Sequence, residues 1–149
     1  MNERPDTATE LRARALRLLA RREHSRAELA RKLAPRVESK EALDSLLDQL
    51  EQKKQLSDER FAAERARMLS RKYGAARIRQ DLKARGVDRE MIDRISSEGE
   101  LERASAILNR KYREPAATRE ERAKRGRFLQ SRGFSSEIIF KLLSARDAG

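Results

Sequence analysis

Apolar residues recur along this chain at the three- and four-residue spacing of an amphipathic helix. The pattern can be followed through nine segments, with these anchors: Leu11, Ala15, Leu18 and Leu19; Leu29 and Leu33; Leu43, Leu46, Leu47 and Leu50; Ala62, Ala66, Leu69 and Tyr73; Ile78 and Leu82; Met91, Ile92 and Ile95; Leu101, Ala104, Leu108 and Tyr112; Leu129; Ile138, Ile139, Leu142 and Leu143. No segment of strand length alternates cleanly between apolar and polar residues. The pattern therefore predicts an all-α protein of nine helices.

Polar caps and helix breakers mark the ends of these segments. Thr7-x-x-Glu10, Ser25-x-x-Glu28 and Thr118-x-x-Glu121 have the spacing of capping boxes, in which a hydroxyl and a carboxylate satisfy the first helical N–H groups. Pro35 is expected to end the second helix, because proline cannot continue the backbone hydrogen bonding. Gly74 is expected to separate the fourth helix from the fifth.

The segments repeat in groups of three. The turn before the third helix is the clearest copy, since residues 82–92 match residues 129–139 position by position. Gly86 and Gly133 hold the same place in these copies, at a helix C-terminus where a left-handed backbone is expected. Units of this size bury little surface alone, so neighbouring units are expected to stack.

The sequence thus predicts three tandem three-helix, helix-turn-helix-like repeats in an elongated, curved arrangement. The predicted boundaries are residues 1–56, 57–99 and 100–149. One longer loop is expected in the last repeat, over residues 113–117.

Composition adds a binding role to this helical scaffold. The net charge is +11 and the pI near 10.6, which favours a polyanionic partner; a basic surface without a partner is the alternative. No apolar run approaches the roughly 18 residues of a membrane span. The N-terminus does not resemble a signal peptide, so we expect a cytoplasmic protein without a membrane.

Residues typical of catalysis and metal binding are scarce. The chain has one histidine, His24, and no cysteine, and it contains no glycine-rich phosphate loop. His24 is interpreted as a structural residue at the end of the first helix. Acidic residues are spread along helix faces among Lys and Arg, as in ordinary surface pairs. We therefore expect no cofactor, no metal and no enzymatic activity.

Charge follows the repeats in blocks. Residues 12–32, 60–85 and 103–132 carry net charges of +6, +7 and +7, whereas 36–59 and 86–102 carry −3 and −4. The third helices are therefore acidic or near neutral. Phosphates would repel such helices, which argues against a recognition helix reading bases in the major groove. The other helices could still contact a DNA backbone without sequence preference.

The basic blocks supply the candidate binding residues. The densest patch contributes Arg71, Lys72, Tyr73, Arg77, Arg79, Lys83 and Arg85; the first repeat adds Arg21, Arg22 and Arg26, and the third adds Arg110, Lys111, Lys124 and Arg125. Arg77, Arg79 and Lys83 are expected to lie off the apolar seam, so that the fold would tolerate their replacement. The alternative is that the patch is only a solvated helix face.

Two stretches of this sequence resemble the RecX family of bacterial recombination regulators. Residues 56–62 fit its D-x-x-[FY]-A helix, and residues 71–87 fit its Y-G-x-x-[RK]-I-x-x-[ED]-L-x-x-[RK]-G-[IV] run. Weaker similarity lies in residues 22–29 and 127–135, and the resemblance spans about residues 11–143. One departure is Ala75, where relatives often have proline.

The resemblance implies three three-helix repeats and a regulator that binds along the groove of the RecA–DNA filament. There it would suppress filament growth, ATP hydrolysis, strand exchange and the co-protease activity behind the SOS response. Some relatives also bind DNA, so single- or double-stranded DNA is a further expected partner. We expect a monomer. Two alternatives stay open: a non-specific basic nucleic-acid-binding protein, and a structural adaptor that uses the acidic third helices.

Overall fold

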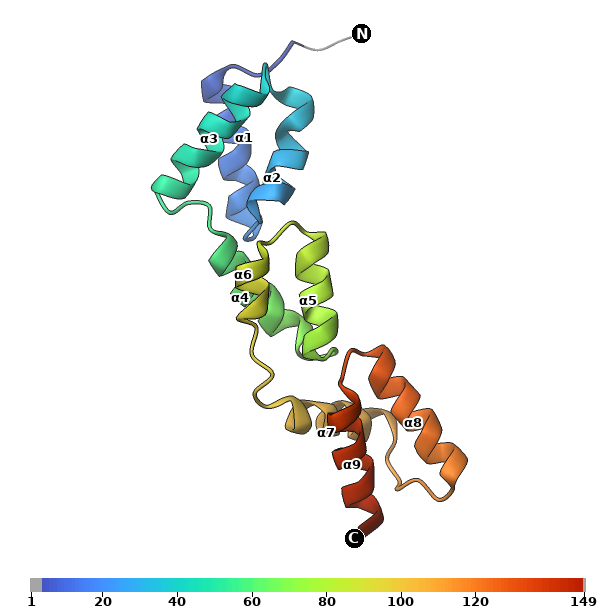
Figure 1. The fold of residues 1–149 in the computed structure, drawn as a ribbon. Coiled ribbons are helices and arrows are strands. Elements are labelled where there is room, and N and C mark those ends of the chain that lie inside the picture. The colour runs from blue at the N-terminus through green and yellow to red at the C-terminus, as the bar shows by residue number, and fades with distance from the viewer. Residues whose placement is uncertain (1–3, 149) are drawn as a thin grey trace. The chain divides into compact units, whose positions relative to one another are not determined.

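The computed structural model describes residues 4–148 and contains only helices and connecting segments within that range, as predicted. The elements in chain order are α1 (Ala8–Arg21), α2 (Arg26–Leu33), the 3-10 turn η1 (Ala34–Arg36), α3 (Lys40–Gln52), α4 (Asp58–Leu69), α5 (Ala75–Ala84), α6 (Arg89–Asp93), α7 (Glu100–Lys111), α8 (Arg119–Ser131) and α9 (Ser136–Ala148) (Figure 1). Contacts divide the chain into two compact units. Unit 1 comprises the chain up to Arg65 with Leu82–Ile92, and unit 2 comprises Ala66–Asp81 with the chain from Asp93 onward.

Local capping determines where several helices begin. Thr7 and Ser25 each form a complete capping box with the glutamate three residues later, as the sequence predicts. Thr118 forms only half of one: its hydroxyl accepts from the Glu121 N–H, but the Glu121 carboxylate accepts from the N–H of Ala117, 2.6 Å away. Pro35 lies inside η1, and α2 ends just before that turn.

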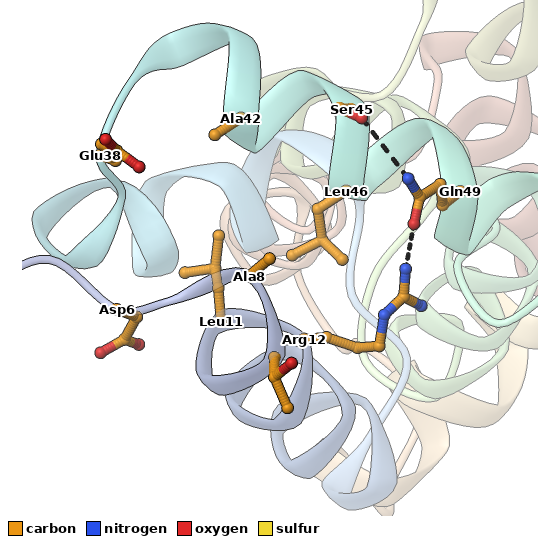
Figure 2. A pocket seen from close by; sticks show the side chains of 10 residues that line it. Asp6, Ala8, Leu11, Arg12, Glu38, Ala42, Ser45, Leu46 and Gln49 are labelled. Atoms are coloured by element: carbon orange, nitrogen blue, oxygen red, sulfur yellow. Dashed lines mark hydrogen bonds between the residues drawn. The ribbon is translucent and has the colours of Figure 1, made fainter.

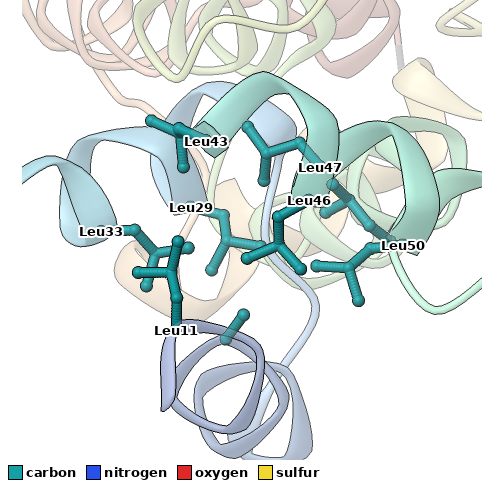
Figure 3. Packing of buried hydrophobic residues seen from close by; sticks show 9 residues of the cluster. Leu11, Leu29, Leu33, Leu43, Leu46, Leu47 and Leu50 are labelled. Atoms are coloured by element: carbon teal, nitrogen blue, oxygen red, sulfur yellow. The ribbon is translucent and has the colours of Figure 1, made fainter. Parts of the chain in front are cut away.

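The core of the first repeat is made of leucines on the facing sides of three helices. Leu11 comes from α1, Leu29 and Leu33 come from α2, and α3 contributes the row that includes Leu47 and Leu50 (Figure 3). Full burial of one such side chain stabilises the fold by about 1.5–3 kcal/mol. The apolar periodicity therefore predicted the core-facing sides of α1, α2 and α3 correctly.

A second core cluster belongs to α7, α8 and α9. Ala104, Leu108 and Leu129 are fully buried there, with Phe134 and Leu142 packed beside them. The buried residues Ala104, Leu108 and Leu129 are positions that the apolar pattern marks in the third repeat. Leu101, which the pattern also marks, is 36% exposed and lies outside the cluster. The cluster fixes the C-terminal ends of α7 and α8 in unit 2.

Both repeat glycines have the left-handed backbone that their position predicts. Gly86 has φ +83° and Gly133 has φ +93°. Each is also crowded: an ideal Cβ on Gly133 would lie 2.5 Å from the Arg77 Cβ, and one on Gly86 would lie 2.4 Å from the Ala27 Cβ. Conformation and close packing therefore both require glycine at these turns.

The sixth helix is shorter than its apolar pattern predicts. It ends at Asp93, before Ile95, and the Ile95 carbonyl accepts a hydrogen bond of 2.8 Å from the guanidinium of Arg79. In a longer helix the Ile95 carbonyl would accept a hydrogen bond from a backbone N–H of the same helix. Here it accepts from the side chain of Arg79 instead.

His24 has the structural role expected of it. Its ring is 1% exposed; Nδ1 lies 3.0 Å from the Arg22 carbonyl oxygen and Nε2 lies 2.9 Å from the Lys32 Nζ. An ammonium can only donate, so Nε2 accepts and Nδ1 carries the proton. Burial lowers the pKa of His24, which favours this neutral form.

Candidate functional site

Five basic side chains line one hollow in unit 2, which we call the basic hollow. Its volume is about 670 Å³, and its lining residues are Arg71, Lys72, Tyr73, Ile107, Arg110, Lys111, Phe128 and Arg132. They come from the segment after α4, the end of α7 and the end of α8. None of these lining residues is acidic. The hollow therefore concentrates charge of one sign.

Backbone contacts hold the segment after α4 in place. The guanidinium of Arg110 donates to the Arg71 carbonyl at 2.7 Å, and the N–H of Gly74 donates to the Arg132 carbonyl at 2.7 Å. The approach at Gly74 is very close, because an ideal Cβ there would lie 2.5 Å from the carbonyl oxygen of Gly133. Glycines on both sides of this contact let two basic segments meet.

Aromatic rings lie between the cations of the basic hollow. Arg132 stacks over Tyr73 and Phe128, with its Cζ 5.4 Å and 5.1 Å from the ring centroids. Lys111 Nζ lies 4.2 Å from the Phe128 centroid, and Arg77 Cζ lies 4.7 Å from that of Tyr73. Each such contact stabilises the fold by about 0.5–1 kcal/mol at an exposed site. The rings thereby offset part of the repulsion between neighbouring positive charges.

This arrangement is suited to bind anionic groups. A recess lined by one sign of charge focuses the electric field, and guanidinium groups match the geometry of phosphate and carboxylate oxygens. Cations already cover faces of Tyr73 and Phe128 that stacking bases would need. The hollow is therefore better matched to a charged backbone or an acidic surface than to bases.

A metal site needs several ligating side chains close together, and a membrane span needs a long apolar helix. Among the described residues, no group of three or more His, Cys, Asp or Glu could hold a metal ion. Nor is any helix in residues 4–148 both long and apolar enough to cross a bilayer.

The basic hollow brings together five of the residues that the charge pattern selected: Arg71, Lys72, Tyr73, Arg110 and Lys111. They lie just after α4 and at the end of α7, where the sequence repeats a basic pair, so two copies of one sequence feature meet. The pattern missed Ile107, Phe128 and Arg132. Phe128 and Arg132 lie within residues 127–135, the weaker stretch of the resemblance, and Arg132 also ends the basic block of residues 103–132.

The other selected residues lie outside the hollow. Lys83, Lys124 and Arg21 are exposed on their own helices. Arg22 and Arg85 both contact the buried carboxylate of Glu28, at 3.2 Å and 2.8 Å.

Three more of the selected arginines are engaged within the fold. Arg26 pairs with Glu51 on α3 at 2.5 Å. Arg77 is exposed but donates to the Ser131 carbonyl at 2.8 Å, and Arg79 donates to the carbonyl of Ile95, which follows α6. The apolar pattern placed Arg77 and Arg79 off the seam but did not predict these hydrogen bonds.

Arg125 is not on the surface, although its charge suggested a contact residue. Its side chain is 7% exposed and its guanidinium lies 4.4 Å from the Tyr112 ring centroid. An arginine on the core-facing side of α8 can be buried in this way because an aromatic ring faces its charge.

A smaller hollow of about 310 Å³ lies between α1 and α3 in unit 1 (Figure 2). The Asp6 carboxylate there is 2.8 Å from Arg14, and the hydrogen bond from Arg14 lowers the pKa of Asp6. Arg12 donates to the side chain of Gln49, whose amide reaches the Ser45 hydroxyl at 3.5 Å (Figure 2). These polar groups already have partners within the fold, so this hollow is the weaker candidate.

Three family models match the chain in order. Those of the first, second and third three-helix domains of RecX match residues 12–50, 57–94 and 98–143. The chain is 40% identical over 147 residues to the Regulatory protein RecX of Ralstonia nicotianae, covering 97% of this chain and 92% of the relative. It is 44% identical over 138 residues to the protein of the same name from Herbaspirillum seropedicae, covering 91% and 90%.

Solved structures share the fold. The crystal structure of RecX from Lactobacillus salivarius superposes with a TM-score of 0.83 at 18% identity, covering 95% of this chain and 97% of that one. A second crystal structure, of a regulatory protein RecX, gives a TM-score of 0.72 at 23% identity, covering 92% and 74%. At these identities the likeness supports the three-helix-repeat fold alone.

Proposed function

This chain belongs to the RecX family of regulatory proteins, and from that premise we propose that it binds the RecA–DNA filament through the basic hollow and restrains RecA. Family membership supports a regulatory role. The observation that carries the finer proposal is the basic hollow, with five cations and no acidic residue in its lining.

The proposed partner matches the chemistry of the hollow. A nucleoprotein filament repeats the same anionic groups along its length, so one basic site can meet an equivalent target at every protomer. Exposed cations outside the hollow, such as Lys83 and Lys124, would add weaker contacts. Several weak contacts on one chain strengthen one another, because each raises the effective concentration of the next. Binding in this way would oppose filament growth, ATP hydrolysis and strand exchange.

The test uses charge reversals at exposed positions, and the variant also loses the cation–π contact between Lys111 and Phe128. Arg71→Glu and Lys72→Glu change exposed side chains, and Lys111→Glu adds a third exposed position. The matched control reverses three exposed positions in unit 1, Arg17→Glu, Lys40→Glu and Lys53→Glu, with the same change in net charge. Each protein is assayed for inhibition of the DNA-dependent ATP hydrolysis of RecA and for binding to RecA filaments.

The hollow variant should need at least about tenfold more protein for half-maximal inhibition, whereas the control should stay close to the parent. Filament binding by the variant should also depend less steeply on salt, since each lost phosphate contact lowers the slope by about 0.9. Equal inhibition by the parent and a folded hollow variant would remove the proposal.

Binding to naked DNA tests the alternative function. A general nucleic-acid-binding protein would bind naked DNA as tightly as RecA-coated DNA across a salt series, and both would weaken together in the hollow variant. A clear preference of the parent for the filament supports the RecA assignment.

A further inference from the structure

A second recess lies between α8 and α9 in unit 2, which we call the α8–α9 groove. Its volume is about 600 Å³, and its lining residues are Arg119, Arg122, Ala123, Gly126, Arg127, Gln130, Ser136, Ile139, Phe140, Leu143 and Ser144. It shares no residue with the basic hollow.

The floor of the α8–α9 groove is apolar. Gly126 has no side chain to fill the space between the helices; an ideal Cβ there would lie 3.5 Å from Ile139 Cγ2 and 3.6 Å from Leu143 Cδ1. Phe140 lies beside this recess and is 71% exposed, although phenylalanine is usually buried. Its neighbours on α9 pack against the core cluster of unit 2, whereas Phe140 does not belong to it. An exposed ring next to an apolar recess is typical of an interaction surface.

The rim of the groove is basic. Arg119 and Arg127 are exposed, Arg122 is half-buried, and none of the lining residues is acidic. All three rim cations are arginines, whose planar forks bind carboxylates with two parallel hydrogen bonds. An apolar floor with a guanidinium rim matches a partner that carries bulky apolar side chains and carboxylates together.

We propose that the α8–α9 groove binds an acidic amphipathic segment of a partner protein. Apolar side chains of the segment insert beside Phe140 and over Gly126, while its carboxylates pair with Arg119 and Arg127. This is the helix-in-groove mode, in which apolar anchors lie three or four residues apart on the bound segment. Charge complementarity selects an acidic segment over a basic one.

Nucleic acid fits this groove less well than it fits the basic hollow. Phosphates would gain from the arginines but would offer no apolar group to Phe140 or to the accessible parts of Ile139 and Leu143. A second copy of this chain is also disfavoured. Its most acidic helix, α3, already buries Leu43, Leu47 and the other leucines of its apolar side, so it has no anchor to offer.

The probe is a fluorescein-labelled peptide of about 18 residues, or five helical turns, with Leu and Phe at helical spacing and Glu between them. Fluorescence anisotropy gives its affinity for the full chain. One matched peptide replaces every Glu with Gln, and another replaces the apolar anchors with Ser. The parent protein should bind only the acidic amphipathic peptide.

Two variants separately change the exposed ring beside the groove and the empty space on its floor. Phe140→Ser removes the exposed ring, and Gly126→Leu fills the recess; each should weaken peptide binding by at least about tenfold. Met68→Ser removes a 53% exposed apolar side chain outside the groove, and Gly126→Ala adds only a methyl group in ordinary contact; both should keep the parent affinity. Far-UV circular dichroism confirms that each variant is folded.

Peptide binding by the α8–α9 groove can fail or succeed separately from RecA inhibition by the basic hollow. The variant with Arg71→Glu, Lys72→Glu and Lys111→Glu should bind the peptide like the parent even though it loses inhibition. Unchanged peptide affinity in Phe140→Ser and Gly126→Leu overturns the proposal, as does equal binding of the Gln peptide. Tighter binding of a labelled oligothymidylate that is lost in Phe140→Ser also overturns it, because the groove would then bind nucleic acid.

Discussion

The buried carboxylate of Glu28 should account for a measurable part of the stability of unit 1. Its side chain is 8% exposed and accepts hydrogen bonds from Arg22, Arg85 and the N–H of Ser25. It therefore joins the start of α2 to the end of α5. The informative change is Glu28→Gln, because glutamine can still complete the capping box with Ser25 while the charge is lost.

The size of the effect follows from the surroundings of the pair. Removing one partner of a fully buried ion pair costs about 3–5 kcal/mol. The side chains of Arg85 and Arg22 are 31% and 43% exposed, so water can replace part of their lost interaction with the carboxylate. We therefore expect Glu28→Gln to lower the free energy of unfolding by about 2 kcal/mol at pH 7.

The loss of unfolding free energy caused by Glu28→Gln should depend on pH. Burial alone raises the pKa of Glu28, but hydrogen bonds from Arg22, Ser25 and Arg85 and the charge of Arg22 outweigh it and lower the pKa from 4.5 to about 2. A carboxylate with a lowered pKa stabilises the fold fully above its unfolded pKa, and this contribution is lost as the pH falls toward the folded value. The difference between parent and Glu28→Gln should shrink between pH 4.5 and pH 2.

Urea unfolding followed by circular dichroism at several pH values measures this difference. Glu10→Gln is the matched control, since Glu10 holds the same place in the capping box of α1 but pairs with a 68% exposed Arg4. Glu10→Gln should be clearly less destabilising. Equal losses in the two variants, or a Glu28→Gln loss that persists unchanged at pH 3, would refute the reasoning.

Three further changes test the fold. Gly133→Ala should lower the free energy of unfolding by more than about 2 kcal/mol, measured by urea unfolding, because its φ is +93° and a Cβ would lie 2.6 Å from the Arg77 nitrogen. Ala75→Pro should cost about 1 kcal/mol in the same assay despite a stiffer unfolded chain, since it removes the N–H that donates to the buried Glu100 carboxylate at 2.5 Å. His24 should make stability fall as the pH drops below 6.5, because the unfolded state then binds the proton more readily; unfolding of His24→Asn at pH 7 and pH 5 should show a smaller decline.

The fold could be predicted to the extent that it depends on local interactions. The complete boxes at Thr7 and Ser25 involve residues three apart, a spacing that the sequence shows directly. The same spacing at Thr118 gives only half a box, because the Glu121 carboxylate accepts from Ala117 instead. The end of α6 could not be predicted in this way. It coincides with a hydrogen bond between Arg79 and the Ile95 carbonyl, and no periodic pattern encodes which distant side chain reaches a given carbonyl.

The charge pattern selected several residues of the basic hollow but did not predict that they lie together. Arg71 follows the end of α4 and Arg110 lies near the end of α7. The charge pattern treated every arginine in a block as a surface cation, although Arg125 is buried and Arg26 pairs with Glu51. Long side chains lay their stems along apolar surface and can turn their charge inward or outward, so helical spacing alone does not reveal their direction.

The arginines of this chain therefore perform two tasks, and the distinction changes how its net charge should be understood. In unit 1, Arg22 and Arg85 face the carboxylate of Glu28, which neutralises one of their two positive charges. In unit 2, five cations share the basic hollow without an acidic lining residue. At physiological salt, fields from exposed charges decay over about 8 Å, so an approaching polyanion senses local clusters and not the total of +11. The salt dependence of binding should accordingly reflect the few cations of the hollow rather than all the basic residues of the chain.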